Sequence, residues 1–192
     1  MGTLSTDVSN GTPSKEAGDE RNERNSTAVH SADHSTRGWK AASGCSQAAT
    51  AKKLERLIKG VPASKLRKRP AADKWSVSEI VAHFGDAEIV IGFRMRLILG
   101  APGIPIAAYD QDSWVTSGHY EKRDPHKSVE QFRVLREANL ALLKSLTPEQ
   151  WKHCGMHSER GQETIEHIVR MTAGHDMNHL LQIQRLLPAK RK

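Results

Sequence analysis

The sequence predicts an all-α protein: a four-helix bundle with a long crossover loop, preceded by a disordered N-terminal tail. Beyond residue 48, four segments repeat apolar residues with the 3.6-residue period of a helix. No segment alternates apolar and polar residues as a half-buried strand does, and no internal repeat is present. The first 48 residues have no apolar period at all. These observations indicate one helical domain with a tail.

Residues 1–48 are rich in Ser, Thr, Gly, Asn and charged residues and contain few apolar ones. A segment of this composition cannot bury enough apolar surface to offset the entropy that is lost on ordering. We therefore expect a disordered tail at 1–48, the helical domain at 49–188 and a basic C-terminal end at 189–192. His30 and His34 lie in the tail and are not candidates for a site.

The four helices are predicted at roughly 49–60, 77–99, 126–146 and 163–187. The start of the second is marked best, because Ser76 and Glu79 have the spacing of a capping box. This start places His83 about two turns inside the helix. The connection from about 101 to 124 is long for a bundle and contains large apolar residues, so we expect it to fold back and wall a pocket.

Lys and Arg number 29 against 22 Asp and Glu, which gives a formal net charge of +7. An excess of positive charge raises the question of a nucleic-acid partner. The basic run of Lys65, Arg67, Lys68 and Arg69 has no interleaved aromatic residues and matches no recognition motif. We interpret it as a solvated surface and expect no nucleic-acid partner.

The two cysteines, Cys45 and Cys154, form neither a C-x-x-C pair nor a disulfide framework, which indicates a reducing, cytoplasmic compartment. The N-terminus has neither the basic start nor the apolar run of a signal peptide. The most apolar window, Ile89–Leu99, includes Arg94 and Arg96, so we expect no membrane-spanning segment.

Three of the ten histidines stand out by their helical phase. His175 and His179 are four residues apart and fall at the centre of the apolar stripe of the fourth helix, with Ile168 and Ile183. Two neutral imidazoles one turn apart can bind one metal ion. His83 falls at the edge of the apolar stripe of the second helix. If the second and fourth helices pack antiparallel, His83 can meet His175 and His179.

The alternative interpretation is that these are core histidines satisfied by hydrogen bonds. Burying two imidazoles without good partners costs on the order of 2 kcal/mol or more, so spacing alone leaves both interpretations open. His153 and His157 share the spacing but lie in a Gly-containing connection with no further ligands nearby, which disfavours a zinc site there. We expect His119, His126 and His167 at the surface or as capping groups.

Five motifs follow one another along the chain: Lys74–His83 (KWSVSEIVAH), Tyr109–Trp114 (YDQDSW), Leu135-Arg136, Gly161–Ile165 (GQETI) and Gly174–Ile183 (GHDMNHLLQI). In this order and spacing, they make residues 50–187 resemble the DinB/YfiT-like superfamily of four-helix bundles, which are regarded as metalloenzymes. The resemblance implies a long crossover and a pocket at one end of the bundle. It also implies that His83, His175 and His179 hold a divalent ion, Zn or Ni first, with Mn or Fe as alternatives.

Characterised members of this superfamily include S-transferases that use bacillithiol or mycothiol and a mycothiol-dependent maleylpyruvate isomerase, and many members have no known activity. The resemblance thus implies a small-molecule substrate and a low-molecular-weight thiol as cosubstrate. Because relatives are often dimers, it also implies a homodimer. The family name refers to DNA-damage induction and does not imply DNA binding.

Three neutral imidazoles leave a divalent ion with its full charge and with open coordination positions. Such an ion lowers the pKa of bound water toward about 7 and deprotonates a bound thiol. We therefore expect a metal-dependent thiol S-transferase or hydrolase. The alternative is a non-catalytic metal-binding stress or interaction protein, because the motifs contain no compelling general base. Asp176, beside the ligands, either orients an imidazole or, as is commoner for such a residue, contacts solvent or a helix end.

Overall fold

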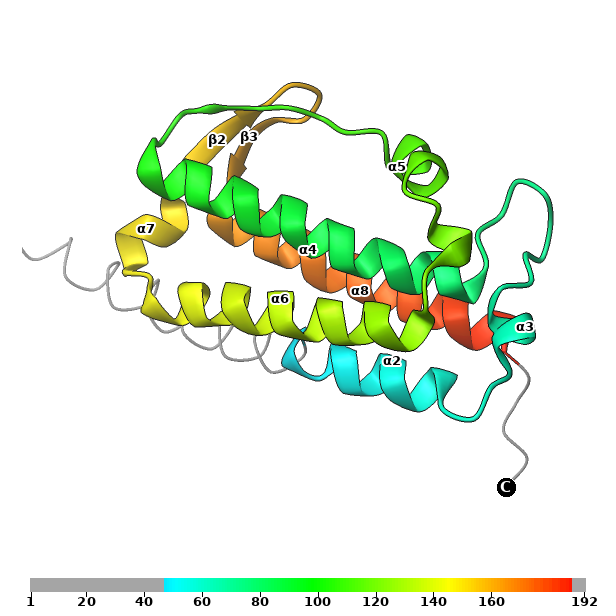
Figure 1. The fold of residues 1–192 in the computed structure, drawn as a ribbon. Coiled ribbons are helices and arrows are strands. Elements are labelled where there is room, and N and C mark those ends of the chain that lie inside the picture. Colours follow the sequence, from blue (N-terminus) through cyan, green and yellow to red (C-terminus); the bar gives the residue numbers. More distant parts are fainter. Residues whose placement is uncertain (1–46, 188–192) are drawn as a thin grey trace, which may run out of the picture. The chain divides into compact units, whose positions relative to one another are not determined.

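The computed structural model describes residues 47–187, and this part of the chain is the predicted four-helix bundle (Figure 1). The four long helices are α2 (Thr50–Ile58), α4 (Val77–Gly100), α6 (Pro125–Ser145) and α8 (Ile165–Leu186). Each boundary lies within two residues of the predicted one. The tail predicted at 1–48 lies outside the described residues except for its last two positions, and the basic end predicted at 189–192 lies outside them entirely.

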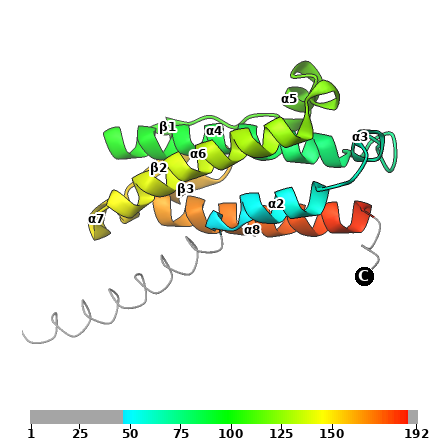
Figure 2. The same ribbon diagram turned by 60° about the horizontal axis from the view of Figure 1, so that its bottom comes forward.

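The bundle has two layers, with α4 beside α6 in one layer and α2 beside α8 in the other (Figure 2). Figure 1 shows that α4 and α6 run in the same direction and that α2 and α8 run opposite to them. The chain therefore has to return along the whole bundle between α4 and α6, and the long 101–124 connection does this. As predicted, the histidine-bearing helices α4 and α8 are antiparallel.

The 101–124 connection is not irregular throughout, since it contains β1 (Pro105–Ile106), α5 (Gln111–Ser117) and the 3₁₀-helix η1 (Tyr120–Lys122). Two further short helices are α3 (Ala63–Leu66) and α7 (Pro148–Lys152). No helix among residues 47–187 combines the length and apolar character that crossing a bilayer requires.

A small three-stranded sheet covers one end of the bundle, and the sequence analysis did not predict it. β2 (Cys154–His157) pairs in parallel with β1 and antiparallel with β3 (Gly161–Thr164), so β2 is the central strand. Strands of two to four residues are too short to show an alternating pattern. The last two residues of β3 fall in the range that was predicted as the start of the fourth helix.

The start of α4 is held by the predicted capping box. The Glu79 amide donates to Oγ of Ser76 at 3.3 Å, and the Ser76 amide donates to Oε2 of Glu79 at 2.7 Å. Arg69, from the basic run, donates from its Nε to both carboxylate oxygens of Glu79 at 3.0 Å. The capping box satisfies the backbone amides of Ser76 and Glu79, which have no partner within the helix, and α4 therefore begins at a fixed residue.

The layer of α4 and α6 is packed closely around Gly92. A Cβ atom added at Gly92 would lie 2.4 Å from Oδ1 of Asn139 on α6. Asn139 cannot easily move away, because its amide donates to the carbonyl and to the carboxylate of Glu88. A side chain at position 92 would therefore require Asn139 to move and to give up these hydrogen bonds.

A buried ionic network joins all four long helices. Arg136 on α6 donates to both carboxylate oxygens of Asp176 on α8, at 2.7 and 3.0 Å, and pairs with Glu88 on α4 at 2.8 Å. Asp176 also accepts a hydrogen bond of 2.8 Å from the Thr50 hydroxyl on α2. All four side chains are at most 5 % exposed, so each depends on the others in place of water.

Replacing Arg136 tests how much the bundle depends on this network. In Arg136→Met, Glu88 and Asp176 would be buried without their cation, so we expect the free energy of unfolding to fall by about 3 kcal/mol or more. Arg133→Met is the matched control on the same helix, because Arg133 pairs only with exposed glutamates and should cost less than about 1 kcal/mol. Urea denaturation measures both variants, and equal losses would contradict a central role for Arg136.

Candidate metal centre

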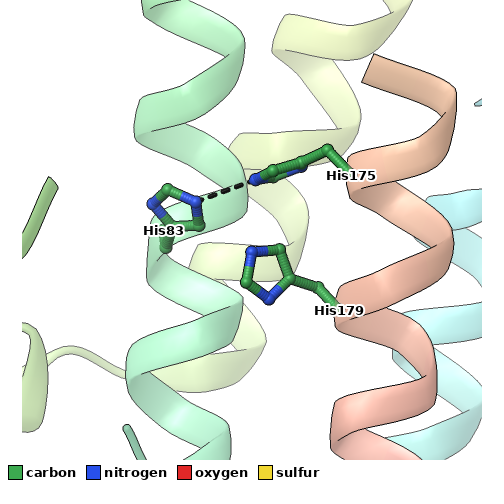
Figure 3. Close-up of side chains that lie close together, drawn as sticks. All are labelled: His83, His175 and His179. Carbon is green, nitrogen blue, oxygen red and sulfur yellow. Dashed lines mark hydrogen bonds between the residues drawn. The ribbon is translucent and has the colours of Figure 1, made fainter. Parts of the chain in front are cut away.

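The three predicted ligands come together between two helices. His83 extends from α4 toward His175 and His179 on α8, and the three rings face one another (Figure 3). One ring nitrogen of each histidine lies within 4.8 Å of the others, and no other group of three such ligands occurs among residues 47–187. Nε2 of His83 and Nε2 of His175 are 2.9 Å apart.

The residues of α8 that face the centre of the bundle differ from the predicted ones. The innermost residue between Thr172 and Leu180 is Asp176, whereas His175 and His179 are half-buried at the edge of the stripe. The reason is the pairing of Asp176 with Arg136, which turns the carboxylate into the bundle centre. His83 differs in the opposite sense, because it is fully buried rather than at an edge.

Aromatic side chains surround the histidine cluster. Trp75 stacks on His179 with ring centroids 6.3 Å apart and an interplanar angle of 13°, and it contacts His83 at 5.0 Å. Phe84 meets His175 and His179 edge-on at 5.8 and 5.7 Å. These rings cover part of the cluster and leave the face of His175 toward the cleft open.

Two of the three imidazoles are held neutral at physiological pH. Burial, followed by the charges of His175 and His179, lowers the pKa of His83 to about 3. Burial, followed by the charge of His175, lowers the pKa of His179 to about 4. A neutral imidazole is the form that binds a metal ion, so these rings need not lose a proton before binding.

Polar neighbours orient two of the rings. Nδ1 of His179 lies 2.9 Å from Oε1 of Gln182, one turn further along α8, so Nδ1–H donates to the amide and Nε2 stays available. Nδ1 of His175 lies 3.9 Å from Oδ1 of Asp176, which is an electrostatic contact longer than a hydrogen bond. Gln182 was not among the predicted site residues, although its i+3 spacing from His179 places both on one helix face.

The interpretation of Asp176 as a solvent or helix-end contact is wrong. Its side chain is 5 % exposed and is occupied by Arg136 and Thr50. Asp176 therefore joins three helices, and its contact with His175 is only the longer one of 3.9 Å.

The donor set suits one first-row divalent ion. Bonds from an ion to imidazole nitrogens are about 2.0–2.1 Å long, which requires the nitrogens themselves to lie within about 4 Å of one another. The separations in the cluster are close to this condition without any rearrangement of the helices. Three nitrogens from rigid helices leave at least one coordination position for another ligand.

A cleft of about 760 Å³ adjoins the cluster, and His175 forms part of its wall. Further lining residues come from α4, α8, the sheet region and the 108–112 part of the long connection. The expectation that this connection walls a pocket is therefore confirmed. The cleft gives a small molecule access to the face of His175 that is not covered by aromatic rings.

The remaining histidines in the described part do not join the cluster. Among residues 47–187, His153 and His157 belong to no group of three potential ligands. His157 is nevertheless buried in β2 and lines the cleft, which its place in a Gly-containing connection did not indicate. His119, His126 and His167 are exposed, as expected.

The low pKa values predict how the stability of the metal-free protein depends on pH. The unfolded chain binds protons at His83 and His179 near pH 6.5, whereas the folded chain binds them only near pH 3–4. The free energy of unfolding should therefore fall as the pH is lowered from about 6.5 toward 4. In His83→Asn, the change in the free energy of unfolding with pH should be smaller by up to about 1.4 kcal/mol per pH unit. Denaturation in the presence of a chelator measures this, and an unchanged slope would contradict it.

Proteins with similar sequences carry names that refer to a metal. The chain is 25% identical over 135 residues to the candidate metal-dependent hydrolase YfiT of Bacillus subtilis. This alignment covers 70% of this chain and 76% of YfiT. It is 22% identical over 132 residues to the candidate metal-dependent hydrolase OB0413 of Oceanobacillus iheyensis, with coverage of 69% and 76%.

Two solved structures have a similar fold. The structure of YfiT from Bacillus subtilis, described as having an unusual four-helix bundle topology, superimposes with a TM-score of 0.73 at 24% identity over 77% of this chain and 85% of YfiT. A mycothiol-dependent maleylpyruvate isomerase superimposes with a TM-score of 0.60 at 11% identity, over 75% of this chain and 60% of the isomerase. The family model of the DinB superfamily matches residues 48–183, and this protein therefore belongs to the DinB superfamily.

Proposed function

We propose that this protein is a metal-dependent enzyme that holds a divalent ion on His83, His175 and His179. Its substrate is a small molecule in the adjoining cleft, and the acceptor of the transferred group is water or a low-molecular-weight thiol. The observation that carries the proposal is the position of His175, which belongs both to the cluster of converging nitrogens and to the wall of the cleft. Zn and Ni are the first candidates for the ion, followed by Mn and Fe.

An open site favours an enzyme over a non-catalytic metal protein. Structural zinc sites are closed by four protein ligands, whereas catalytic sites use three and leave a position for water or substrate. The described residues supply three ligands here, and about 760 Å³ of space lies beside one of them. A metal that served only to hold the bundle together would not need this access.

The residues of the chain prepare the site in three ways. Gln182 fixes the tautomer of His179, burial keeps His83 neutral, and the aromatic rings cover part of the cluster. The cleft places a substrate next to His175. When bound, a divalent ion would supply Lewis acidity and would lower the pKa of a coordinated water or thiol.

The names of the similar proteins refer to chemistry with water and to chemistry that depends on a thiol. The two relatives from Bacillus subtilis and Oceanobacillus iheyensis are named as candidate hydrolases, for which the acceptor is water. The isomerase with a similar fold depends on the thiol mycothiol. Because the same three-nitrogen site activates either group, the acceptor is decided by what the cleft binds.

Metal content tests the first half of the proposal. The purified protein should carry close to one divalent ion per chain, and His179→Ala should lose it and should no longer gain thermal stability when metal is added. His167→Ala is the matched control, because His167 lies on the same helix but is exposed. Elemental analysis and thermal unfolding measure both variants. Metal-free protein whose stability is unchanged in His179→Ala would overturn the assignment.

Turnover tests the second half. The metal-loaded protein should act on a panel of small esters, amides and electrophiles, either in water alone or with mycothiol or bacillithiol added. Activity should disappear with a chelator and return with the metal, and His179→Ala should be inactive under all conditions. A metal-binding protein that shows no turnover with either acceptor would support the non-catalytic alternative.

A further inference from the structure

The cleft extends well beyond the histidine cluster, toward the sheet. Arg94 on α4 lines it eleven residues after His83, which is about 16 Å along the helix. His157 of β2 and Arg160, just before β3, line it as well. The lining also contains carboxylates, and the proposed function gives the donors of Arg94, His157 and Arg160 no role.

His157 has a buried donor without an acceptor. The Glu159 amide donates to Nδ1 of His157 at 3.2 Å, so the ring proton lies on Nε2. Nε2 is inaccessible and has no hydrogen-bond partner among the described residues, and the residue as a whole is 3 % exposed. An unpaired buried N–H is unfavourable, and an acceptor supplied by a molecule bound in the cleft would remove this cost.

Arg94 is a cation without a carboxylate partner in the described part of the chain. Of its five N–H groups, one donates to the Ala107 carbonyl at 2.7 Å, and its guanidinium lies 5.7 Å from the ring centroid of Tyr109. Burial lowers the pKa of Arg94, and the charge of Arg160 lowers it further, against a smaller opposite effect of Glu163. The charged form of Arg94 would thus be stabilised by an added anion.

None of the acidic residues of the cleft lining, Asp110, Asp112 and Glu159, forms an ion pair with Arg94 in the described part of the chain. Glu163 is buried and is bound by Arg160, whose Nε and Nη2 donate to its two carboxylate oxygens at 2.5 and 3.2 Å. Asp110 caps α5, where its Oδ1 accepts from the amides of Asp112 and Ser113. The guanidinium of Arg94 is therefore not paired with a carboxylate, and Nε2 of His157, a residue of the cleft lining, has no acceptor among the described residues.

We propose that Arg94 and His157 form an oxyanion-binding subsite, which holds a carboxylate or phosphate group of the substrate at the sheet end of the cleft. A guanidinium matches the two oxygens of such a group, and the Nε2–H of His157 supplies a third donor. The substrate is therefore an anionic small molecule whose reacting group lies toward His175. The orientation of the reacting group rests on the proposed function, whereas the subsite itself depends only on residues of this chain.

Titration with small anions tests the subsite. Acetate and inorganic phosphate are added to the full chain in two forms, stripped with a chelator and loaded with zinc, with acetamide as the neutral comparison. Acetate stands for a carboxylate substrate and phosphate for a phosphorylated one. Calorimetry measures the affinity, and NMR follows the Nε2–H resonance of His157. We expect at least one anion to bind in both forms and to shift this resonance, and we expect acetamide not to bind.

Variants separate the subsite from the metal. Arg94→Gln should weaken anion binding by about tenfold or more, because it removes a charged donor, and should leave the metal content unchanged. Arg185→Gln on α8 removes the same charge outside the cleft lining and should bind anions as the unaltered protein does. Arg94→Lys keeps the charge but loses the paired donors, and should give an intermediate affinity.

The outcomes distinguish the two proposals. Anion affinity that is unchanged in Arg94→Gln, or that appears only with zinc, would overturn the subsite, since the anion would then be binding elsewhere or on the metal. Arg94-dependent anion binding in a protein that never binds a divalent ion would uphold the subsite and overturn the proposed function. Failure of both anions to bind the unaltered protein would overturn the subsite alone.

Discussion

A buried guanidinium determines how the four helices of this bundle face one another. Arg136 pairs with one carboxylate from α4 and another from α8, and the second of these, Asp176, also accepts a hydrogen bond from α2. Charged groups that have lost their water satisfy one another only in close and well-aligned contacts, so the network restricts the rotation of each helix about its axis. On α8, this rotation puts Asp176 innermost and turns His175 and His179 toward α4. The meeting of the three histidines therefore depends on an ion pair outside their cluster.

The same network carries an excess of negative charge next to the histidine cluster. Glu88 and Asp176 contribute two negative charges and Arg136 one positive charge, so the buried group has a formal charge of −1. Its nearest contact with the cluster is the 3.9 Å between Oδ1 of Asp176 and Nδ1 of His175. A cation held by neutral imidazoles would lie close enough to offset this charge across a low-dielectric interior. The arrangement that orients the helices thus also favours a cation at the cluster.

The sequence predicted what depends on local patterns. The helices follow from their apolar period and from signals such as the Ser76 and Glu79 capping box, and His175 and His179 follow from their spacing on one helix. The role of Arg136 could not be predicted from phase alone, because a charged residue in an amphipathic helix is usually exposed and its partners lie on other helices. His157 was missed for a related reason: its strand is four residues long, too short to show a pattern, and it pairs with strands that are distant in sequence or equally short.

Three histidines on two helices form a site of broad chemical use, so the choice of reaction has to come from the rest of the cleft. Such a site binds several divalent ions and can activate water or a thiol, and nothing in the three imidazoles distinguishes these uses. The cleft wall is more selective, because Arg94 carries a charge that no carboxylate pairs with and His157 carries a donor without an acceptor, and one anionic group would satisfy both. These donors lie on the long helix α4 and on the central strand of the sheet, which fixes their distance from the cluster. A substrate that satisfies both ends must therefore match this distance as well as the charge, and this constraint sets the specificity of the site.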